Sequence, residues 1–182
     1  MISYLLAGPA QEPVALADAR AFLKLDDTAE DALLQALITA ARLHVEAVTA
    51  RAMLHQSWRL VRDAWPATRT LALPVTPVSA LSAVTVFDAD DEPQALDHDA
   101  FLLQAGQLLL PRDIAVAARP QLGIEIDYVA GYGSDPAQVP ADLKHACLVL
   151  LAYWFEHRDA VSVAGAPAGF DRLVAPYRQV ML

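Results

Sequence analysis

Apolar residues recur at intervals of three and four in two stretches near the beginning of the chain, and this spacing predicts two helices. The first helix is short and carries the apolar residues Leu16, Ala19 and Leu23. Residues 1–13, which precede it, are rich in apolar side chains followed by Gly and Pro, so this segment is expected to be extended.

The second predicted helix begins after Thr28 and runs to about Arg51. Thr28 suits the N-cap position, and Asp31, three residues later, comes close to a capping box. The apolar positions of this helix form one stripe: Leu34, Leu37, Ile38, Ala41, Val45 and Val48. Arg42 is expected to lie off this stripe.

From about Leu54 to Val129 the pattern changes to short alternations rich in Val, Thr, Trp and Pro, which predicts β-strands. The candidate strands are residues 56–63, 70–73, 81–87, 101–103, 108–110 and 123–129. No stretch of crossover-helix length separates them, so the strands are expected to form an antiparallel sheet made of hairpins. Whether this sheet closes into a barrel stays open.

A long helix is predicted from about Pro140 to Arg158, and it contains ten consecutive apolar residues, 146–155. This run is too short to span a bilayer, which needs about 20 residues. Its inner face is expected to pack on the stripe of the second helix: Leu143, Cys147, Leu150 and Leu151. Three large rings follow in a row, Tyr153, Trp154 and Phe155, and they suit either a core or a subunit interface.

After this helix, small residues at 162–169 form a linker, and an apolar tail follows. The pattern as a whole predicts an α+β fold: a helical bundle with a small antiparallel β-sheet or barrel inserted between its helices. We expect one domain over residues 1–182. Its parts are a helical core at 14–53 and 138–159, a β insertion at 54–130, and a linker and tail at 160–182.

Composition narrows the classes of function. The chain of 182 residues is 55% hydrophobic and only 19% charged, so it has apolar surface to cover, for which an oligomer interface is one answer. Its net charge of −9 and the absence of a run of Arg or Lys argue against a protein that binds the phosphate backbone of nucleic acid tightly. The single cysteine, Cys147, excludes an intrachain disulfide and a Cys-based zinc site. We expect no signal peptide and no membrane segment.

Four local patterns resemble catalytic or ligand sites, and each has a simpler explanation. The acidic run Asp88, Asp90, Asp91, Glu92, Asp97 and Asp99 lacks the Gly and Glu that an EF-hand calcium loop requires, and a solvated hairpin tip is favoured. Cys147 and His145, two residues apart on a helix, point to different faces, so a core cysteine is favoured.

The Gly131–Gly133 turn lacks the following Gly-Lys-Ser/Thr of a phosphate loop. The five histidines show no metal-binding spacing. We therefore expect no catalytic, cofactor or metal residues.

Taken in order, several blocks of the chain resemble the head–tail connector, or adaptor, proteins of long-tailed phages and gene transfer agents. The most telling is the series YVAGYG at 128–133, VP at 139–140 and AYWFEHR at 152–158. The other blocks are residues 12–19, 22–26, 30–34, 48–53, 56–60, 73–74, 84–86 and 172–178. Together they cover nearly the whole chain.

This resemblance implies a structural protein without enzymatic activity, made in the bacterial cytoplasm and located in the neck of the particle. Such proteins form a ring, usually dodecameric, between the portal and a stopper or tail-completion protein, and they leave a channel through which DNA passes without specific binding. The C-terminal segment is expected to dock on the portal through Phe170, Leu173, Val174, Tyr177, Arg178, Met181 and Leu182. Tyr153, Trp154 and Phe155 are expected at the subunit interface. The alternative is a small enzyme or ligand-binding module with a pocket in the β insertion.

Overall fold

The computed structural model describes residues 1–104, 106–114, 118–157 and 166–178. The chain is divided into two compact units, each made of two separate stretches. The β unit contains residues 1–9 and 55–132, and the helical unit contains residues 10–54 and 133–182. The class is therefore α+β, as the sequence predicts.

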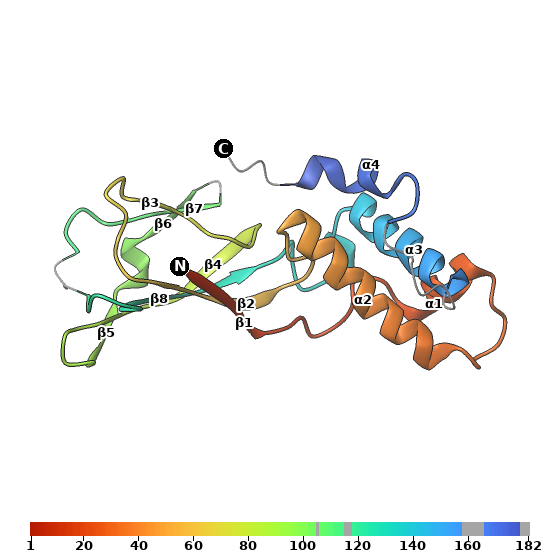
Figure 1. Ribbon diagram of the computed structural model, residues 1–182, viewed down its shortest axis with the longest axis horizontal. Helices are drawn as coiled ribbons and strands as arrows, with labels where there is room; N and C mark the ends of the chain where they lie inside the picture. Colours follow the sequence, from red (N-terminus) through yellow and green to blue (C-terminus); the bar gives the residue numbers. More distant parts are fainter. Residues whose placement is uncertain (105, 115–117, 158–165, 179–182) are drawn as a thin grey trace. The chain divides into compact units, whose positions relative to one another are not determined.

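The described residues of the β unit form two antiparallel sheets (Figure 1). The large sheet has the strand order β1 (Ile2–Ala7), β2 (Gln56–Arg62), β8 (Ile124–Ala130), β4 (Val78–Phe87) and β5 (Pro93–Leu96). The small sheet has the order β3 (Thr70–Ala72), β7 (Gln107–Leu109) and β6 (Leu102–Gln104). Within this part of the chain each sheet keeps two free edges, so neither closes into a barrel.

The predicted strands appear within a few residues of their expected bounds, but two strands differ from expectation. The extended N-terminal segment pairs with β2 as strand β1, with Tyr4 opposite Arg59. Strand β5 begins at Pro93, where the sequence predicts only a turn. Both lie at edges of the large sheet, where pairing to a single neighbour leaves only a weak alternation in the sequence.

Strand β8 lies in the middle of the large sheet and shows the alternation of a sheet with one buried face. Ile124, Ile126, Tyr128 and Ala130 are buried, while Glu125 and Asp127 between them are partly exposed. On that second face Arg59 of β2 binds Asp127 through two nitrogens at 2.6 and 2.7 Å and Glu125 at 2.6 Å. The hydrogen bond to Asp127 is the main reason that the pKa of Arg59 is raised. The register of β2 against β8 is therefore fixed by apolar burial on one face of the sheet and by the Arg59 ion pairs on the other.

The helical unit contains α1 (Leu16–Leu23), α2 (Asp31–Thr49), α3 (Ala141–Glu156) and the short α4 (Phe170–Val174). Helix α2 packs along α3, α1 contacts both, and α4 lies against α3 and α2 (Figure 1). The predicted pairing of apolar faces is confirmed: four residues of the α2 stripe and the four inner residues of α3 are buried. They are Leu34, Ile38, Ala41 and Val45 of α2 and Leu143, Cys147, Leu150 and Leu151 of α3.

The predicted cap of α2 is wrong. The helix begins at Asp31 after Glu30, and no side chain caps it; Thr28 contributes only its backbone carbonyl, which accepts from the Asp31 N–H. Both carboxylate oxygens of Asp31 are instead bound to Arg20 of α1. The first turn of α2 is therefore held by an ion pair to the preceding helix, an interaction between residues too far apart for a capping pattern to indicate.

The two glycines between β8 and α3 have different physical roles. Gly131 has φ of 137°, a conformation that favours glycine, and its N–H donates to the Pro77 carbonyl. At Gly133 a Cβ would lie 2.0 Å from Oε1 of Gln138, so a larger residue would displace this side chain from its capping position. Gln138 and Asp135 form a capping box around η2 (Pro136–Gln138). The turn is therefore occupied by the protein's own side chain, which agrees with a structural turn.

Truncating Leu150 tests the assignment of the helical core. Leu150 is fully buried between helices, so Leu150→Ala is expected to lower the free energy of unfolding by about 2–5 kcal/mol. Leu43→Ala on α2 is the matched control, because that side chain is 53% exposed and its loss should change stability by less than about 0.5 kcal/mol. Denaturant unfolding of both variants measures the difference, and equal effects would contradict the packing.

Candidate assembly surfaces

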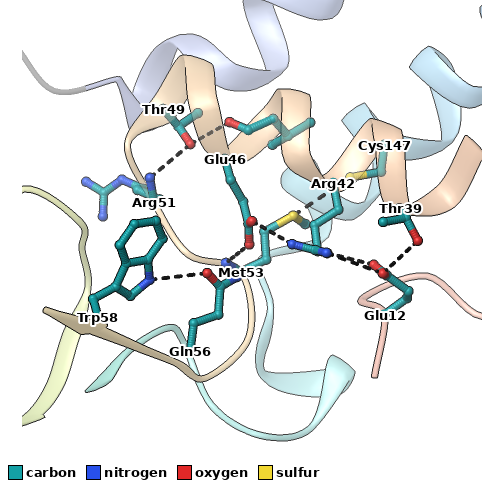
Figure 2. A network of polar contacts seen from close by, with 11 residues as sticks. Glu12, Thr39, Arg42, Glu46, Thr49, Arg51, Met53, Gln56, Trp58 and Cys147 are labelled. Carbon is teal, nitrogen blue, oxygen red and sulfur yellow. Dashed lines mark hydrogen bonds and ion pairs between the residues drawn. The ribbon is translucent and has the colours of Figure 1, made fainter. Parts of the chain in front are cut away.

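A buried charge network joins α2 to the segments before α1 and after α2 (Figure 2). The Arg42 Nε–H donates to Glu12 at 2.7 Å, and its Nη1–H donates to Glu46 at 2.8 Å. The Thr39 hydroxyl also donates to Glu12, at 2.9 Å. The second oxygen of Glu46 accepts from the backbone N–H of Met53 at 2.9 Å. One guanidinium thus holds three parts of the helical unit together.

Arg42 is only 7% exposed, although its position lies off the predicted apolar stripe. Burial alone would lower the pKa of Arg42, but the hydrogen bonds and charges of Glu12 and Glu46 outweigh it, and the pKa is raised. The spacing of Arg42 and Glu46 by four residues is a local signal for this pair. Glu12 lies thirty positions away, and no pattern in the sequence connects it to Arg42.

Beside this network the helical unit has an open hollow of about 970 Å³. Its wall is formed by the segment 11–18, by α1 and α2, by η2 and by one side of α3. Most of the lining is apolar, including Val14, Phe22 and Leu148, and the charged residues are Glu12, Asp18 and Lys144. A mostly apolar wall with a few polar and charged groups is the usual composition of a binding surface.

The aromatic run Tyr153, Trp154 and Phe155 ends α3, and all three side chains are partly exposed. The Trp154 ring makes an edge contact with His44 of α2 at 5.9 Å between centroids. The Tyr153 ring lies 4.5 Å from that of His157. The run is therefore anchored in the helical unit on one side and keeps apolar surface on the other.

The segment after the linker is folded onto the helices. Phe170 and Val174 of α4 are buried, and the Phe170 ring lies 5.6 Å from His44. In η3 (Ala175–Tyr177), the Tyr177 carbonyl accepts from Nε of Arg51 at 2.8 Å, and the Arg51 guanidinium also lies 5.9 Å from the Tyr177 ring. These contacts fix the beginning of the predicted docking segment.

The remaining residues predicted for docking differ in exposure. Leu173 is partly exposed, and Arg178 is exposed and paired with Asp171 at 2.5 Å. Met181 and Leu182 lie outside the described residues. The structure thus separates a buried base of the tail, Phe170 and Val174, from positions that are accessible to a partner.

Cys147 and His145 do not come together as a nucleophile and base. Cys147 is buried, its Sγ lies 3.8 Å from the sulfur of Met53, and burial raises the pKa of its thiol to about 12. His145 is exposed, and its ring contacts Phe22 at 6.0 Å between centroids. The placement agrees with the prediction of a core cysteine.

The acidic run lies at the β4–β5 hairpin, as predicted. Asp88 accepts hydrogen bonds from the backbone N–H groups of Asp90 and Glu92 and so closes the turn, while Asp97 caps η1 (His98–Ala100). Within the residues that the structure describes, no group of three or more His, Cys, Asp or Glu side chains could hold a metal ion. No helix in the same ranges is long and apolar enough to cross a bilayer.

Comparison with known families gives these surfaces a context. A family model described as HCP, Head completion protein, matches residues 14–170. The chain belongs to the head completion protein family. No curated protein matches it.

Solved structures extend the match of this head completion protein to its full length. A chain from "Virion of native gene transfer agent (GTA) particle" is 27% identical with a TM-score of 0.84, and one from "Neck of empty GTA particle computed with C6 symmetry" is 26% identical with a TM-score of 0.83. A chain from "Neck of native GTA particle computed with C12 symmetry" is 25% identical with a TM-score of 0.76. Each match covers 100% of this chain and 97% of the other.

Replacing Arg42 tests the role of the charge network in this head completion protein. Arg42→Met leaves two carboxylates facing each other around a buried site, so we expect a loss of about 3–5 kcal/mol in the free energy of unfolding. Arg178→Met removes an exposed ion pair and should cost less than about 1 kcal/mol. Denaturant unfolding compares the two. A small loss in Arg42→Met would show that the network is not structural.

The environment of Cys147 predicts a thiol that does not react in the folded protein. With a pKa of about 12, roughly one thiol in ten thousand is ionised at pH 8, and the side chain is also buried. A disulfide reagent should therefore label the native protein at least about a hundredfold more slowly than the protein unfolded in denaturant. Fast labelling without denaturant would contradict this placement.

Proposed function

We propose that this chain is a structural head–tail connector without enzymatic activity, located in the neck of a phage or gene-transfer-agent particle. The observation that carries the proposal is the full-length match to chains of gene-transfer-agent virions and necks, with a TM-score as high as 0.84. Membership of the head completion protein family supports the same role. The sequence resemblance to head–tail connectors agrees with both.

In this role the chain assembles as a ring, for which the C6 and C12 symmetry of the matched neck structures is the main support. Twelve copies around a C12 axis would give the dodecamer that the resemblance implies. A cyclic ring requires two different surface patches on each copy, because each subunit contacts its neighbours head to tail. The net charge of −9 suits a channel along which DNA slides without being held.

The aromatic run at the end of α3 is one part of the subunit interface in this proposal. Tyr153, Trp154 and Phe155 are held by the helical unit and keep exposed apolar surface, a combination that is common at the centres of protein interfaces. Their side chains need little reordering on contact, because Trp154 and Tyr153 are already packed against histidine rings.

The C-terminal segment is the proposed attachment to the portal, with a stopper or tail-completion protein as the other neighbour of the ring. Phe170 and Val174 are buried and serve as the anchor of this segment in its own subunit. In this proposal the residues that contact the portal are Leu173, Tyr177, Arg178, Met181 and Leu182. An anchored base with an apolar end limits the ordering entropy that docking costs.

The rival function, an enzyme or ligand-binding module in the β unit, has no supporting observation. The hollow described in that unit has a volume of about 500 Å³ and is lined by Arg119, Pro120, Gln121 and Leu122. Among the residues that the structure describes, no carboxylate, histidine or thiol lines it, and an active site needs several such groups in convergent positions.

Removing residues 179–182 tests the attachment to the portal without disturbing the buried base. The truncated chain keeps Phe170 and Val174, so its unfolding midpoint should stay within about 2 °C of the full-length value. We expect it to bind connector-free heads at least tenfold more weakly, measured by co-sedimentation and electron microscopy. Asp90→Asn at the exposed β4–β5 turn is the control and should bind normally. A truncated chain that attaches like the full-length protein would refute the assignment of the tail.

A further inference from the structure

Exposed apolar side chains in the β unit gather on two strands at sheet edges. In the described residues ten large apolar side chains are exposed, and seven of them belong to β1, to the residue just before it, or to β6. They are Met1, Ile2, Tyr4, Leu5 and Leu6 on one edge and Leu102 and Leu103 on the other. Leu102 is 65% exposed and Ile2 is 51% exposed, so these side chains contribute little to the core of the subunit.

Both strands lack charged and proline residues, although β6 is only three residues long and the pairing of β1 with β2 shifts register between Leu5 and Ala7. Strand β1 borders the large sheet and β6 the small sheet, and in the described residues nothing pairs with their outer sides. An open edge of this kind presents backbone N–H and C=O groups to any matching strand.

The other edges of the same unit behave differently. Strand β5 begins with Pro93 and is flanked by the acidic residues Glu92 and Asp97, which are standard protection against edge pairing. Strand β3 presents Thr70 and Ala72 and no large exposed apolar side chain. Large exposed apolar side chains thus distinguish β1 and β6 from the other two edges, β3 and β5.

We propose that β1 of one copy pairs with β6 of the next, so that the large sheet of each subunit continues into the small sheet of its neighbour. The occupant of each edge is thus a second copy of this chain, and the inference rests on the proposed ring. Two different open edges supply the two patches that a head-to-tail ring needs. Pairing of β1 with another β1 would create a two-fold dimer, which does not propagate around a C6 or C12 axis.

Cysteine cross-linking tests this contact in assembled particles. Four double variants combine Tyr4→Cys or Leu5→Cys with Leu102→Cys or Leu103→Cys, so that both faces of each strand are sampled. Native Cys147 is buried, and the parent protein should form no cross-link. Under oxidation at least one double variant should give a ladder of covalent multimers on a denaturing gel. A mixture of the two matching single variants should stop at dimers, and each single variant alone should remain monomeric.

Charge substitutions give an independent readout. Leu5→Lys and Leu102→Lys alter exposed side chains, so both variants should fold with normal unfolding midpoints, but each should enter the neck at least tenfold less than the parent protein. Ala95→Lys on the protected β5 edge is the matched control and should enter normally.

The outcomes separate this inference from the function on which it rests. If the parent protein does not enter particle necks, the proposed function fails. If it enters, but no double variant cross-links and both lysine variants assemble normally, the edge pairing alone is wrong. A cross-link from β1 to a different protein, or dimers from a single β1 cysteine variant, would also overturn the pairing of β1 with β6.

Discussion

The helical unit depends on one buried cation. Arg42 lies among the apolar residues of α2, and its charge is balanced by Glu12 from the segment before α1 and by Glu46 one turn later (Figure 2). Because Glu46 also accepts from the Met53 N–H, the chain is fixed on both sides of α2. A buried guanidinium favours the arrangement that keeps both carboxylates in place, because loss of a partner would leave a buried charge uncompensated. The surfaces of α3 and α4 that we propose for assembly belong to the same unit.

The sequence predicts the helices and central strands well because their signals are local. The stripe of α2 and the inner face of α3 are periodic, and β8 alternates residue by residue. The burial of Arg42 has little local signal, because its partner Glu12 is distant in sequence. The cap of α2 failed for the same reason, since Asp31 binds Arg20. Long-range ion pairs have no spacing by which they can be recognised.

Prediction of the assembly surfaces shows a similar limit. Composition indicates that the chain has apolar surface to cover, but not where that surface lies. The aromatic run of α3 is evident in the sequence, but only the structure shows that the Trp154 ring packs edge-on against His44. In the tail, Phe170 and Val174 read as contact residues, and their burial depends on α2 and α3, far away in the chain. Open edge strands are even harder to predict from sequence, because the order of strands in the folded sheet determines which strands lack a neighbour.

A protein with two open apolar edges must avoid polymerising before its partners are present. Head-to-tail contacts that do not close produce open fibres, so a weak contact is safer than a strong one. The net charge of −9 on each copy opposes association in solution, because like-charged copies repel each other over about a Debye length. A docking site on a particle would raise the local concentration of subunits and offset this repulsion. In the proposed ring, acidic composition and open edges therefore fit together: pairing is disfavoured between free copies and favoured once a template holds them side by side.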